Sequence, residues 1–320
     1  MSDAGSILIV NNITAGYGEG AMVADASFTL ASGEILCLVG ESGCGKSTLL
    51  KAVMGTAPGL QVLSGEIVLD GQSLLPLPEK ERRLLCTEKI GIVSQSPGAS
   101  FNPIRTYRKQ FIETLKSHGK YDRPAFETMV AEAFGKMGLS DTRRILDSCP
   151  YEMSGGMNQR IALSLALLLE QEILLADEPT SALDATIQLQ VAKELLRLRD
   201  VSGMAQVVVT HNLALAQFLA DRIGVMYAGR LVELGTPAQV LSEPRHAYTR
   251  ALIAAIPTLD GRLPTGLDGA PPLSGPSGAG CEFAPRCPVR RAGCAEKRYS
   301  LTNIGGGHLT ACSCGSEGAS

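Results

Sequence analysis

These 320 residues lack three features that would assign a sequence to a common class: an excess of basic charge, a long apolar run and a secretory leader. Lys and Arg number 29 against 32 Asp and Glu, a formal net charge of −3, which excludes a strongly basic nucleic-acid binder as the default class. The densest apolar run, Ile161 to Leu169, is far shorter than the roughly 20 residues that span a bilayer. The first residues carry neither the basic nor the hydrophobic region of a secretory signal, which predicts a cytoplasmic protein.

Tryptophan is also absent and aromatic residues make up only 4%, yet hydrophobic residues reach 45%, so a large core is available and the composition disfavours wholesale disorder. The length corresponds to roughly two domains of about 150 residues. Nine cysteines are distributed unevenly: four lie in the first 280 residues (Cys37, Cys44, Cys86, Cys149) and five in the last 40 (Cys281, Cys287, Cys294, Cys312, Cys314). This skew predicts a globular body with a small, separately held tail. In a reducing compartment such thiols are metal ligands or core residues more often than disulfides.

Apolar runs that end in turn residues alternate with segments of helical spacing. The expected strands are residues 7–10, 27–30, 35–39, 65–71, 173–176 and 206–210, and the expected helices are 46–54, 125–137, 159–169 and 187–199. This alternation predicts an α/β fold with a mostly parallel core sheet. Residues 102–150 are more charged and contain no convincing strand, which indicates an inserted helical subdomain. Residues 259–280 hold six Gly and four Pro and are expected to form a linker.

A phosphate-binding loop is indicated by Gly40-Glu41-Ser42-Gly43-Cys44-Gly45-Lys46-Ser47, which follows an expected strand and opens an expected helix. Its glycines let successive backbone N–H groups curl around phosphate oxygens, and the helix N-terminus adds positive charge. In such a loop Lys46 reaches the β- and γ-phosphates and the Ser47 hydroxyl binds Mg²⁺, with Thr48 next to it. Two interpretations of Cys44 stand open: a redox switch whose thiol pKa the helix N-terminus lowers, or a small residue that a tight loop tolerates.

A second element of this chemistry is the apolar strand Ile173–Ala176, which ends in Asp177 and Glu178. A carboxylate at the mouth of a core strand, opposite a phosphate loop, is placed to hold Mg²⁺. We expect Asp177 to bind the ion through water and Glu178 to act as general base on the attacking water. An apolar run before Asp-Glu is weak evidence alone and becomes strong only together with the loop.

The segment Met153-Ser154-Gly155-Gly156-Met157-Asn158-Gln159-Arg160 resembles the signature of the nucleotide-binding subunits of ABC transporters, Leu-Ser-Gly-Gly followed by a basic or polar stretch. A Ser-Gly-Gly turn at a helix start is a second phosphate nest. In the resembled family this nest binds the ATP of a partner subunit, so the nucleotide is sandwiched in a dimer. Met153 and Asn158 depart from the family's Leu and Arg.

The resemblance extends along the whole chain and implies further roles. Gln95 matches the Q-loop, which links the Mg²⁺ and water site to the helical subdomain. Residues 181–184, which end in Asp184, match the D-loop. His211 matches the switch histidine at the γ-phosphate, although Asn212 replaces the Asp that usually follows it. Tyr17 matches the aromatic residue that stacks on adenine. The resemblance therefore implies three groups of site residues. Those that bind the nucleotide are Tyr17, Gly40, Glu41, Ser42, Gly43, Cys44, Gly45, Lys46, Ser47, Thr48, Ser154, Gly155, Gly156 and Asp184. The catalytic residues are Glu178, His211, Gln95 and Lys46, and the Mg²⁺ ligands are Ser47, Gln95 and Asp177. The other three histidines are expected to be structural or solvated.

The implied fold is a P-loop NTPase of the ABC cassette type: a RecA-like core, an antiparallel β subdomain and an inserted helical subdomain. We expect this ATPase domain to span residues 1–258, with the helical subdomain at about 97–158, the linker at 259–280 and a Cys-rich extension at 281–320. Within the family the chain resembles the subunits of oligopeptide, dipeptide and nickel importers, through residues 100–103, 220–222, 226–230 and 245–249. Ala247 stands where that group has Pro.

The cysteine tail resembles the same group, because Cys281-Glu282-Phe283-Ala284-Pro285-Arg286-Cys287-Pro288 is similar to its Gly-Cys-x-Phe-x-Pro-Arg-Cys-Pro segment. Some members hold a [4Fe–4S] cluster with such cysteines, and four thiolates suit that cluster or zinc. The expected ligands are Cys281, Cys287, Cys294 and Cys312, with Cys314 as an alternative to Cys312. A 40-residue tail has too little core to fold unaided, which favours a staple; unligated thiols are the other interpretation.

The resemblance implies an ATP-hydrolysing subunit that energises a binding-protein-dependent importer, for peptides or alternatively for nickel or a metal chelate. Its implied partners are transmembrane permease subunits, a second and different ATPase subunit, and a substrate-binding protein, at the cytoplasmic face of the membrane. An ABC ATPase acting on nucleic acid is disfavoured by the single cassette and the charge. A catalytically silent subunit is disfavoured because Glu178 and His211 are present.

Overall fold

The computed structural model describes residues 5–18, 20–55, 57–93, 101–180, 185–256, 269–270, 272, 275–276 and 278–314. The chain forms two compact units. The first unit comprises residues 1–30, 35–77 and 209–320, and the second comprises residues 31–34 and 78–208.

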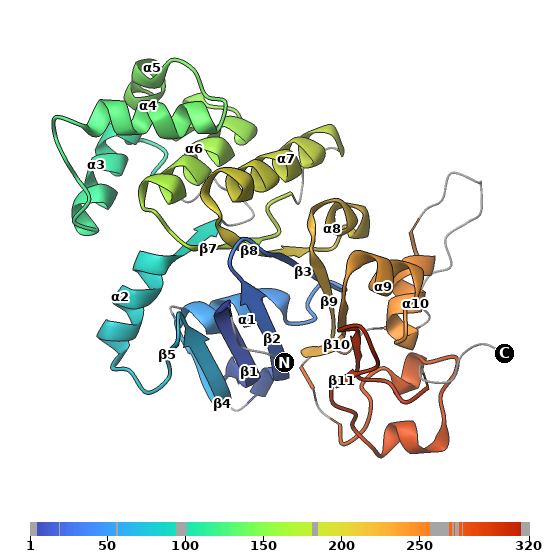
Figure 1. Ribbon diagram of the computed structural model, residues 1–320. Helices are drawn as coiled ribbons and strands as arrows, with labels where there is room; N and C mark the ends of the chain where they lie inside the picture. The colour runs from blue at the N-terminus through green and yellow to red at the C-terminus, as the bar shows by residue number, and fades with distance from the viewer. Residues whose placement is uncertain are drawn as a thin grey trace. The chain divides into compact units, whose positions relative to one another are not determined.

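The first unit contains a four-stranded antiparallel sheet in the order β2-β1-β4-β5 (Figure 1). Its strands are β1 (Ser6–Tyr17), β2 (Gly20–Ala31), β4 (Leu60–Leu69) and β5 (Gln72–Ser73). Alternate residues of β1 are buried, including Leu8 and Val10, so one face of the strand contributes to the core. Asp70 and Gly71 both have positive φ, at 49° and 76°, which closes the tight hairpin between β4 and β5.

The same unit contains a second group of strands in the order β11-β12-β10-β9-β3. The buried strand β3 (Ile35–Val39) runs parallel to β9 (Arg222–Tyr227), whereas β10 (Arg230–Gly235) returns antiparallel. Ala228 and Gly229, with φ of 48° and 80°, make the two-residue turn between β9 and β10. This edge of the fold is therefore mixed rather than purely parallel.

Four helices accompany these strands: α1 (Lys46–Met54), α8 (Leu213–Leu219), α9 (Pro237–Ser242) and α10 (Ala247–Ala254). The last three begin at side chains that accept a backbone N–H of the first turn: Asn212, Thr236 and His246. Burial, and after it the charge of Arg250, lowers the pKa of His246 to about 3. The imidazole therefore stays neutral, and its Nδ1 accepts the N–H of Tyr248 at 3.1 Å.

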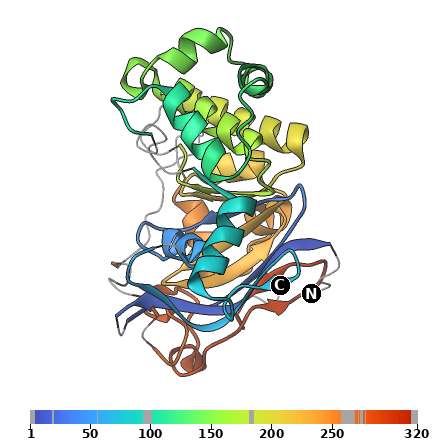
Figure 2. The same ribbon diagram turned by 90° about the vertical axis from the view of Figure 1, so that its left-hand side faces the viewer.

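The C-terminal tail joins the first unit as an added sheet edge. Strand β12 (Leu309–Thr310) pairs antiparallel with β10, and β11 (Thr302–Asn303) pairs with β12. The N–H of Ala311 donates to the carbonyl of Val232 at 2.8 Å, which continues the ladder. The red tail and the blue strands of the N-terminal sheet lie side by side in Figure 2, although they are the two ends of the chain.

The second unit combines parallel strands with helices. Strand β6 (Ile90–Val93) runs parallel to β7 (Ile173–Asp177), and β8 (Ala205–Thr210) neighbours β7. Two long helices belong to this unit, α2 (Glu79–Lys89) before β6 and α7 (Ala185–Ser202) before β8. Four successive buried apolar residues of β7 bring the chain to Asp177.

The helical part of the second unit consists of α3 (Tyr107–Ser117), α4 (Phe126–Lys136), α5 (Thr142–Asp147), the 3₁₀ turn η2 (Pro150–Glu152) and α6 (Gly155–Leu168), drawn in green in Figures 1 and 2. The scarce aromatic residues concentrate here. Phe101, Tyr107, Phe111 and Phe134 meet edge to face or stacked, with ring centroids 5.1–6.4 Å apart. These rings form the centre of a core that is separate from the strands.

Each expected strand and helix overlaps an observed element, although the strand expected at 65–71 ends at Leu69, and the α/β class is confirmed. The sequence analysis expected no separate helix at α2, α3, α5, α8, α9 or α10 and no strand at β5, β6 or β9 to β12. It expected only short pieces of β1 and β2, whose mixed polar and apolar residues weaken the strand pattern. The domain limits proposed above stay predictions, since the linker at 259–280 lies largely outside the described residues. No helix in the described part of the chain has both the length and the apolar character that crossing a membrane requires.

Candidate active site

The phosphate loop connects β3 to α1 in a conformation that only glycine supplies. Gly40 has a φ of 153°, and a Cβ added there would lie 2.2 Å from the carbonyl oxygen of Met226. Gly45 has a φ of 100°, and its added Cβ would lie 2.9 Å from the carbonyl oxygen of Met22. The loop therefore needs both glycines to pass close to neighbouring backbone. A glycine-rich turn of this kind, at the start of α1, can direct successive backbone N–H groups toward one bound anion.

Lys46 turns back over this loop rather than out to solvent. Only 4% of the residue is exposed. Its Nζ donates to the carbonyl oxygens of Gly40 and Glu41, each at 2.9 Å. The ammonium group thus lies over the curve of the loop, held by weak neutral acceptors that an anionic phosphate oxygen would replace favourably. Ser47 and Thr48 are half-buried on the first turn of α1.

Two elements much later in the chain, the β9–β10 turn and α10, hold the loop from outside. The N–H of Gly229 in the β9–β10 turn donates to the carbonyl of Cys44 at 2.8 Å. The N–H of Glu41 donates to the hydroxyl oxygen of Tyr248, on α10, at 2.9 Å. These two contacts fix the ends of the loop and leave its middle, Ser42 and Gly43, exposed.

Cys44 does not have the environment of a reactive thiol. It is buried, and desolvation raises its pKa above the usual value despite the nearby Lys46 ammonium. The expectation that the helix N-terminus lowers this pKa is therefore wrong. A buried thiol with a raised pKa carries little thiolate, which favours the interpretation of Cys44 as a small residue packed in the loop.

Two further residues of the implied nucleotide site belong to the first unit. Tyr17 ends β1 with 43% of its surface exposed, available for stacking. His211 is exposed directly after β8, and the next residue, Asn212, accepts the N–H of Leu215 at 3.1 Å as the cap of α8. Asn and Asp cap helices equally well, so the replacement of the family's Asp by Asn212 preserves this turn.

Asp177 and Glu178 lie at the end of β7 in the second unit. Asp177 is the last residue of the strand and is half-buried. Glu178 has a φ of 48°, a left-handed backbone conformation that is rare for a residue with a long side chain. Such strain is retained where the surrounding structure requires one side chain to point in one direction, and it is concentrated at functional sites.

The signature segment opens α6 in the second unit. Ser154 is the N-cap, and its hydroxyl accepts the N–H of Met157 at 3.3 Å. A Cβ added at Gly155 or Gly156 would meet no described residue outside its own helix within 4 Å, so these glycines border open space in the part of the chain that the structure describes. Asn158 is buried, donates to the carbonyls of Pro150 and Met153, and accepts a hydrogen bond from the Tyr107 hydroxyl. Asn158, which stands where the family has Arg, thus has a structural role. Its position in the signature segment alone did not indicate this role.

Gln95 and Asp184 lie outside the described residues, as does the rest of the segment 181–184. The structure places Tyr17, the phosphate loop and His211 in the first unit, and Asp177, Glu178 and the signature segment in the second. The assignment of these residues to ATP and Mg²⁺ stays a prediction.

The tail cysteines gather around two 3₁₀ turns, η3 (Ala284–Arg286) and η4 (Ala292–Ala295). The N–H of Cys281 donates to the carbonyl of Cys294 at 2.7 Å, and the Sγ atoms of Cys294 and Cys314 lie 3.9 Å apart. Burial, and after it the neighbouring thiols of Cys312, Cys294 and Cys287, raises the pKa of Cys281. The described cysteines form no disulfide. Among the described residues, no group of three or more His, Cys, Asp or Glu side chains is arranged to hold a metal ion.

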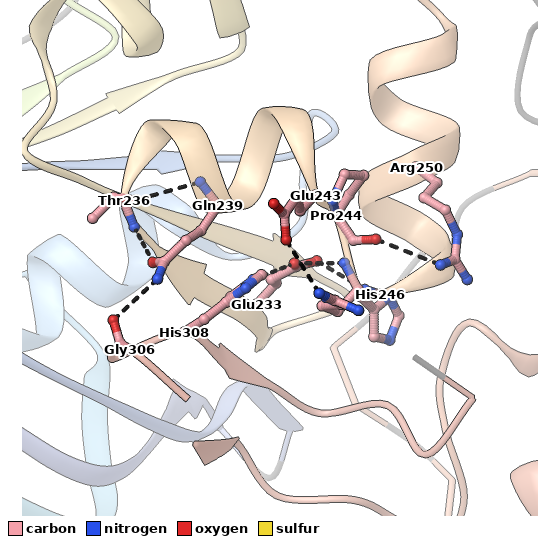
Figure 3. A network of polar contacts seen from close by, with 10 residues as sticks. Glu233, Thr236, Gln239, Glu243, Pro244, His246, Arg250, Gly306 and His308 are labelled. Carbon is pink, nitrogen blue, oxygen red and sulfur yellow. Dashed lines mark hydrogen bonds and ion pairs between the residues drawn. The ribbon is translucent and has the colours of Figure 1, made fainter. Parts of the chain in front are cut away.

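A buried carboxylate fastens the tail to β10 (Figure 3). Glu233 is fully buried and accepts the backbone N–H groups of Arg245 and His246 at 2.8 and 2.9 Å. The tail residue His308 contributes its Nε2, 2.7 Å from the same carboxylate. One buried carboxylate therefore joins β10, the start of α10 and the tail. No sequence signal pointed to Glu233, because a single Glu in a strand has no characteristic spacing.

Two protein families match successive segments of the chain. Residues 23–181 match the family described as ABC transporter, and residues 232–294 match the family described as oligopeptide/dipeptide transporter, C-terminal region. The chain is 37% identical over 305 residues to a probable peptide ABC transporter ATP-binding protein of Sinorhizobium fredii, covering 92% of this chain and 91% of that protein. It is 37% identical over 317 residues to a dipeptide transport ATP-binding protein of Bacillus subtilis, covering 96% and 94%.

Solved structures give the same result for the fold. A component of the cbiONQ ABC transporter complex of Clostridium perfringens superposes with a TM-score of 0.66 at 25% identity, covering 74% of this chain and 91% of that chain. A dimeric ATP-binding cassette in a post-hydrolysis state with ADP and Pi superposes with a TM-score of 0.61 at 26% identity, covering 72% and 98%. These structures confirm the predicted architecture of an ATP-binding cassette.

Proposed function

The chain belongs to the ABC transporter family, in the branch that carries the oligopeptide/dipeptide C-terminal region, and on this premise we propose that it hydrolyses ATP to drive peptide import. The phosphate loop is the single observation that carries the proposal. Its two obligatory glycines and the inward Lys46 ammonium form an anion cradle that a merely structural turn would not need.

In this proposal the residues have separate tasks. Backbone N–H groups from Gly43 to Thr48 and the Lys46 ammonium hold the phosphates, and Tyr17 stacks on adenine. Glu178 accepts a proton from the attacking water, while His211 contacts the γ-phosphate and Gln95 lies beside the water.

The oxygen donors Ser47, Gln95 and Asp177 are of the type that Mg²⁺ prefers. When bound, the ion would neutralise charge that develops on the phosphates. The donor set thus fits the ion by its chemistry.

A second ATPase subunit is part of the proposal because the glycines of the signature segment face open space. Among the described residues, and apart from its chain neighbours and the backbone of its own helix, nothing lies within 4 Å of a Cβ added at Gly155, so packing against that part of the chain does not require glycine there. A nest of N–H groups at the start of α6 that is open to the outside suits the phosphates of a nucleotide bound by another subunit. We propose that this partner is a related but different chain.

Gly155→Ala tests this interface. Since Gly155 begins α6 without a positive φ, alanine should leave the free energy of unfolding unchanged or raise it by up to about 1 kcal/mol. ATP hydrolysis by the assembled transporter should fall about tenfold to a hundredfold, because the new methyl group displaces the partner's nucleotide. The matched control is Gly135→Ala on α4, which also meets nothing within 4 Å and should keep full activity. Equal activities of the two variants would contradict the proposed contact.

We propose peptides as the cargo, with nickel or a metal chelate as the alternative. The oligopeptide/dipeptide C-terminal region and the relatives named for peptide or dipeptide transport support this choice. The chain would be held at the cytoplasmic face of the membrane by permease subunits, and a binding protein would deliver the cargo.

The test reconstitutes the full-length chain with its permease subunits, second ATPase subunit and binding protein in vesicles. ATP hydrolysis should rise severalfold when the binding protein is loaded with dipeptides, since cargo delivery closes the ATPase dimer. The same vesicles with Ni²⁺ in place of dipeptides should stay at the basal rate. Stimulation by Ni²⁺ alone would transfer the proposal to the metal importer.

We further propose that Cys281, Cys287, Cys294 and Cys312 hold an iron–sulfur cluster, or alternatively zinc, with Cys314 as a substitute ligand. Four thiols fit such a group by their chemistry, and those of Cys281, Cys287, Cys294 and Cys312 lie within electrostatic range of one another, although the described side chains are not arranged around a metal ion. When bound, the group would staple a tail that has little core of its own. Iron, sulfide and zinc contents of the anaerobically purified full chain decide between a cluster, zinc and unligated thiols.

A further inference from the structure

The phosphate loop carries a negative charge that the cysteine tail neutralises. Glu41, the second residue of the loop, forms a two-pronged ion pair with Arg286. One guanidinium nitrogen, Nη1, lies 2.9 Å from Oε2 of Glu41, and Nη2 lies 3.2 Å from Oε1. Arg286 ends the η3 turn between Cys281 and Cys287, 245 residues after its partner. A fork of this kind fixes both charge and direction.

The pair is built into the first unit rather than lying loosely on its surface. Only 6% of the Arg286 side chain and 22% of the Glu41 side chain are exposed. The Arg286 Nη1 also donates to the Tyr227 hydroxyl at 3.3 Å, and the guanidinium carbon lies 5.8 Å from the centre of that ring. Side-chain hydrogen bonds to Glu41, opposed in part by burial, raise the pKa of Arg286 above its usual value.

An aromatic cluster holds this turn of the tail against the body. Phe283 is almost fully buried, and its ring centroid lies 5.2 Å from that of Tyr227 and 5.4 Å from that of Tyr248. Tyr248 is the residue whose hydroxyl accepts the N–H of Glu41. The backbone and the side chain of Glu41 are therefore both held by one assembly, which the tail completes.

The charge of Glu41 is unfavourable for the loop's function. Its carbonyl oxygen, like that of Gly40, accepts from Lys46, so the residue is part of the surface over which we expect the phosphates to bind. ATP arrives as a multiply charged anion, and an uncompensated carboxylate in this partly buried loop would repel it. Arg286 cancels this charge and draws the side chain toward the tail.

We propose that Arg286 is a positioning residue of the ATP site, which neutralises Glu41 and thereby allows the phosphate loop to accept a triphosphate. The inference rests on the proposed binding of ATP to this loop. It gives the C-terminal tail a part in nucleotide affinity that is distinct from any metal its cysteines hold. Loss of the tail, or displacement of the η3 turn, then weakens ATP binding even though all loop residues are intact.

The experiment measures the equilibrium affinity of the full-length chain for ATP with Mg²⁺ in four variants. Arg286→Gln should bind ATP about tenfold more weakly, because the carboxylate of Glu41 is left uncompensated. Arg286→Lys, which keeps the charge but not the fork, should stay within about threefold of the unmodified chain. Arg290→Gln, an exposed arginine of the same tail, should bind as the unmodified chain does.

The fourth variant separates charge compensation from support of the fold. Arg286→Gln combined with Glu41→Gln should recover ATP affinity to within about threefold of the unmodified chain, since the repelling charge is gone. A purely structural role of Arg286 predicts no such recovery and no rescue by lysine. Unchanged affinity of Arg286→Gln, or a double variant as weak as the single one, would overturn the inference. An unmodified chain that does not bind ATP would overturn the proposed function itself.

Discussion

Replacement of Glu178 by glutamine is expected to lower the rate of ATP hydrolysis by roughly a hundredfold to ten-thousandfold, the contribution of a positioned general base. Glutamine has almost the same shape and cannot accept the proton of the attacking water. Because in the proposed function the loop and Lys46, rather than Glu178, hold the phosphates, ATP should still bind with nearly unchanged affinity. The variant should therefore accumulate the ATP-bound dimer.

The backbone of Glu178 makes this substitution informative. Residue 178 has a φ of 48°, and this backbone conformation is equally unfavourable for glutamine and for glutamate. A loss of activity then reports the missing proton acceptor rather than a relaxed backbone. Phosphate release at saturating ATP, together with the dissociation constant for ATP, measures the two effects separately. The control is Glu132→Gln, an exposed position on α4, which should keep full activity.

Hydrolysis by Glu178→Gln at more than about a tenth of the normal rate would remove Glu178 from the role of general base. In that case the strained backbone at residue 178 would require another explanation, and Asp177 or His211 would become the candidates. A fall in ATP affinity without a fall in the maximal rate would instead indicate that Glu178 acts on binding.

The parts of the fold that could be predicted are those whose information is local. Residues 35–54 combine a buried apolar run, a glycine loop and a helical pattern in succession, and the structure shows β3, the loop and α1 at these positions. The strand that ends at Asp177 was recognisable for the same reason. In each case the periodicity of a short segment and its terminating residues determine the element.

The contacts that complete the loop could not be predicted because each depends on one residue of a common type far along the chain. Glu41 meets Tyr248 and Arg286, and no spacing within the sequence links these three positions. The choice between the two interpretations of Cys44 could not be made from the sequence for a related reason. The helix N-terminus is a local feature that lowers a thiol pKa, whereas the burial that raises it arises from segments such as β9.

The second large effect is expected at the buried carboxylate of Glu233. Replacement of His308 by alanine should lower the free energy of unfolding of the tail by about 3 kcal/mol, because it removes one of three donors from a fully buried charge. The β10–β12 pairing lies next to this contact, since Glu233 is the register partner of Thr310. The loss of His308 should therefore release β12 and loosen the backbone around the exposed basic residues of the tail, so that a protease can bind and cleave there.

Limited trypsin digestion of the full-length chain measures this release directly, as cleavage between residues 286 and 298 that the unmodified chain resists. His308→Gln, whose amide can still donate to Glu233, should cut the effect to about half. His118→Ala is the control, because that imidazole lies half-buried in the second unit and bonds only to its own helix among the described contacts. If His308→Ala leaves the tail as resistant as before, the backbone donors of Arg245 and His246 suffice for Glu233. The tail would then be held by the contacts of Phe283 with Tyr227 and Tyr248 and by the Arg286–Glu41 ion pair. In that case the part of the tail on which the ATP affinity of the phosphate loop depends would be the η3 turn.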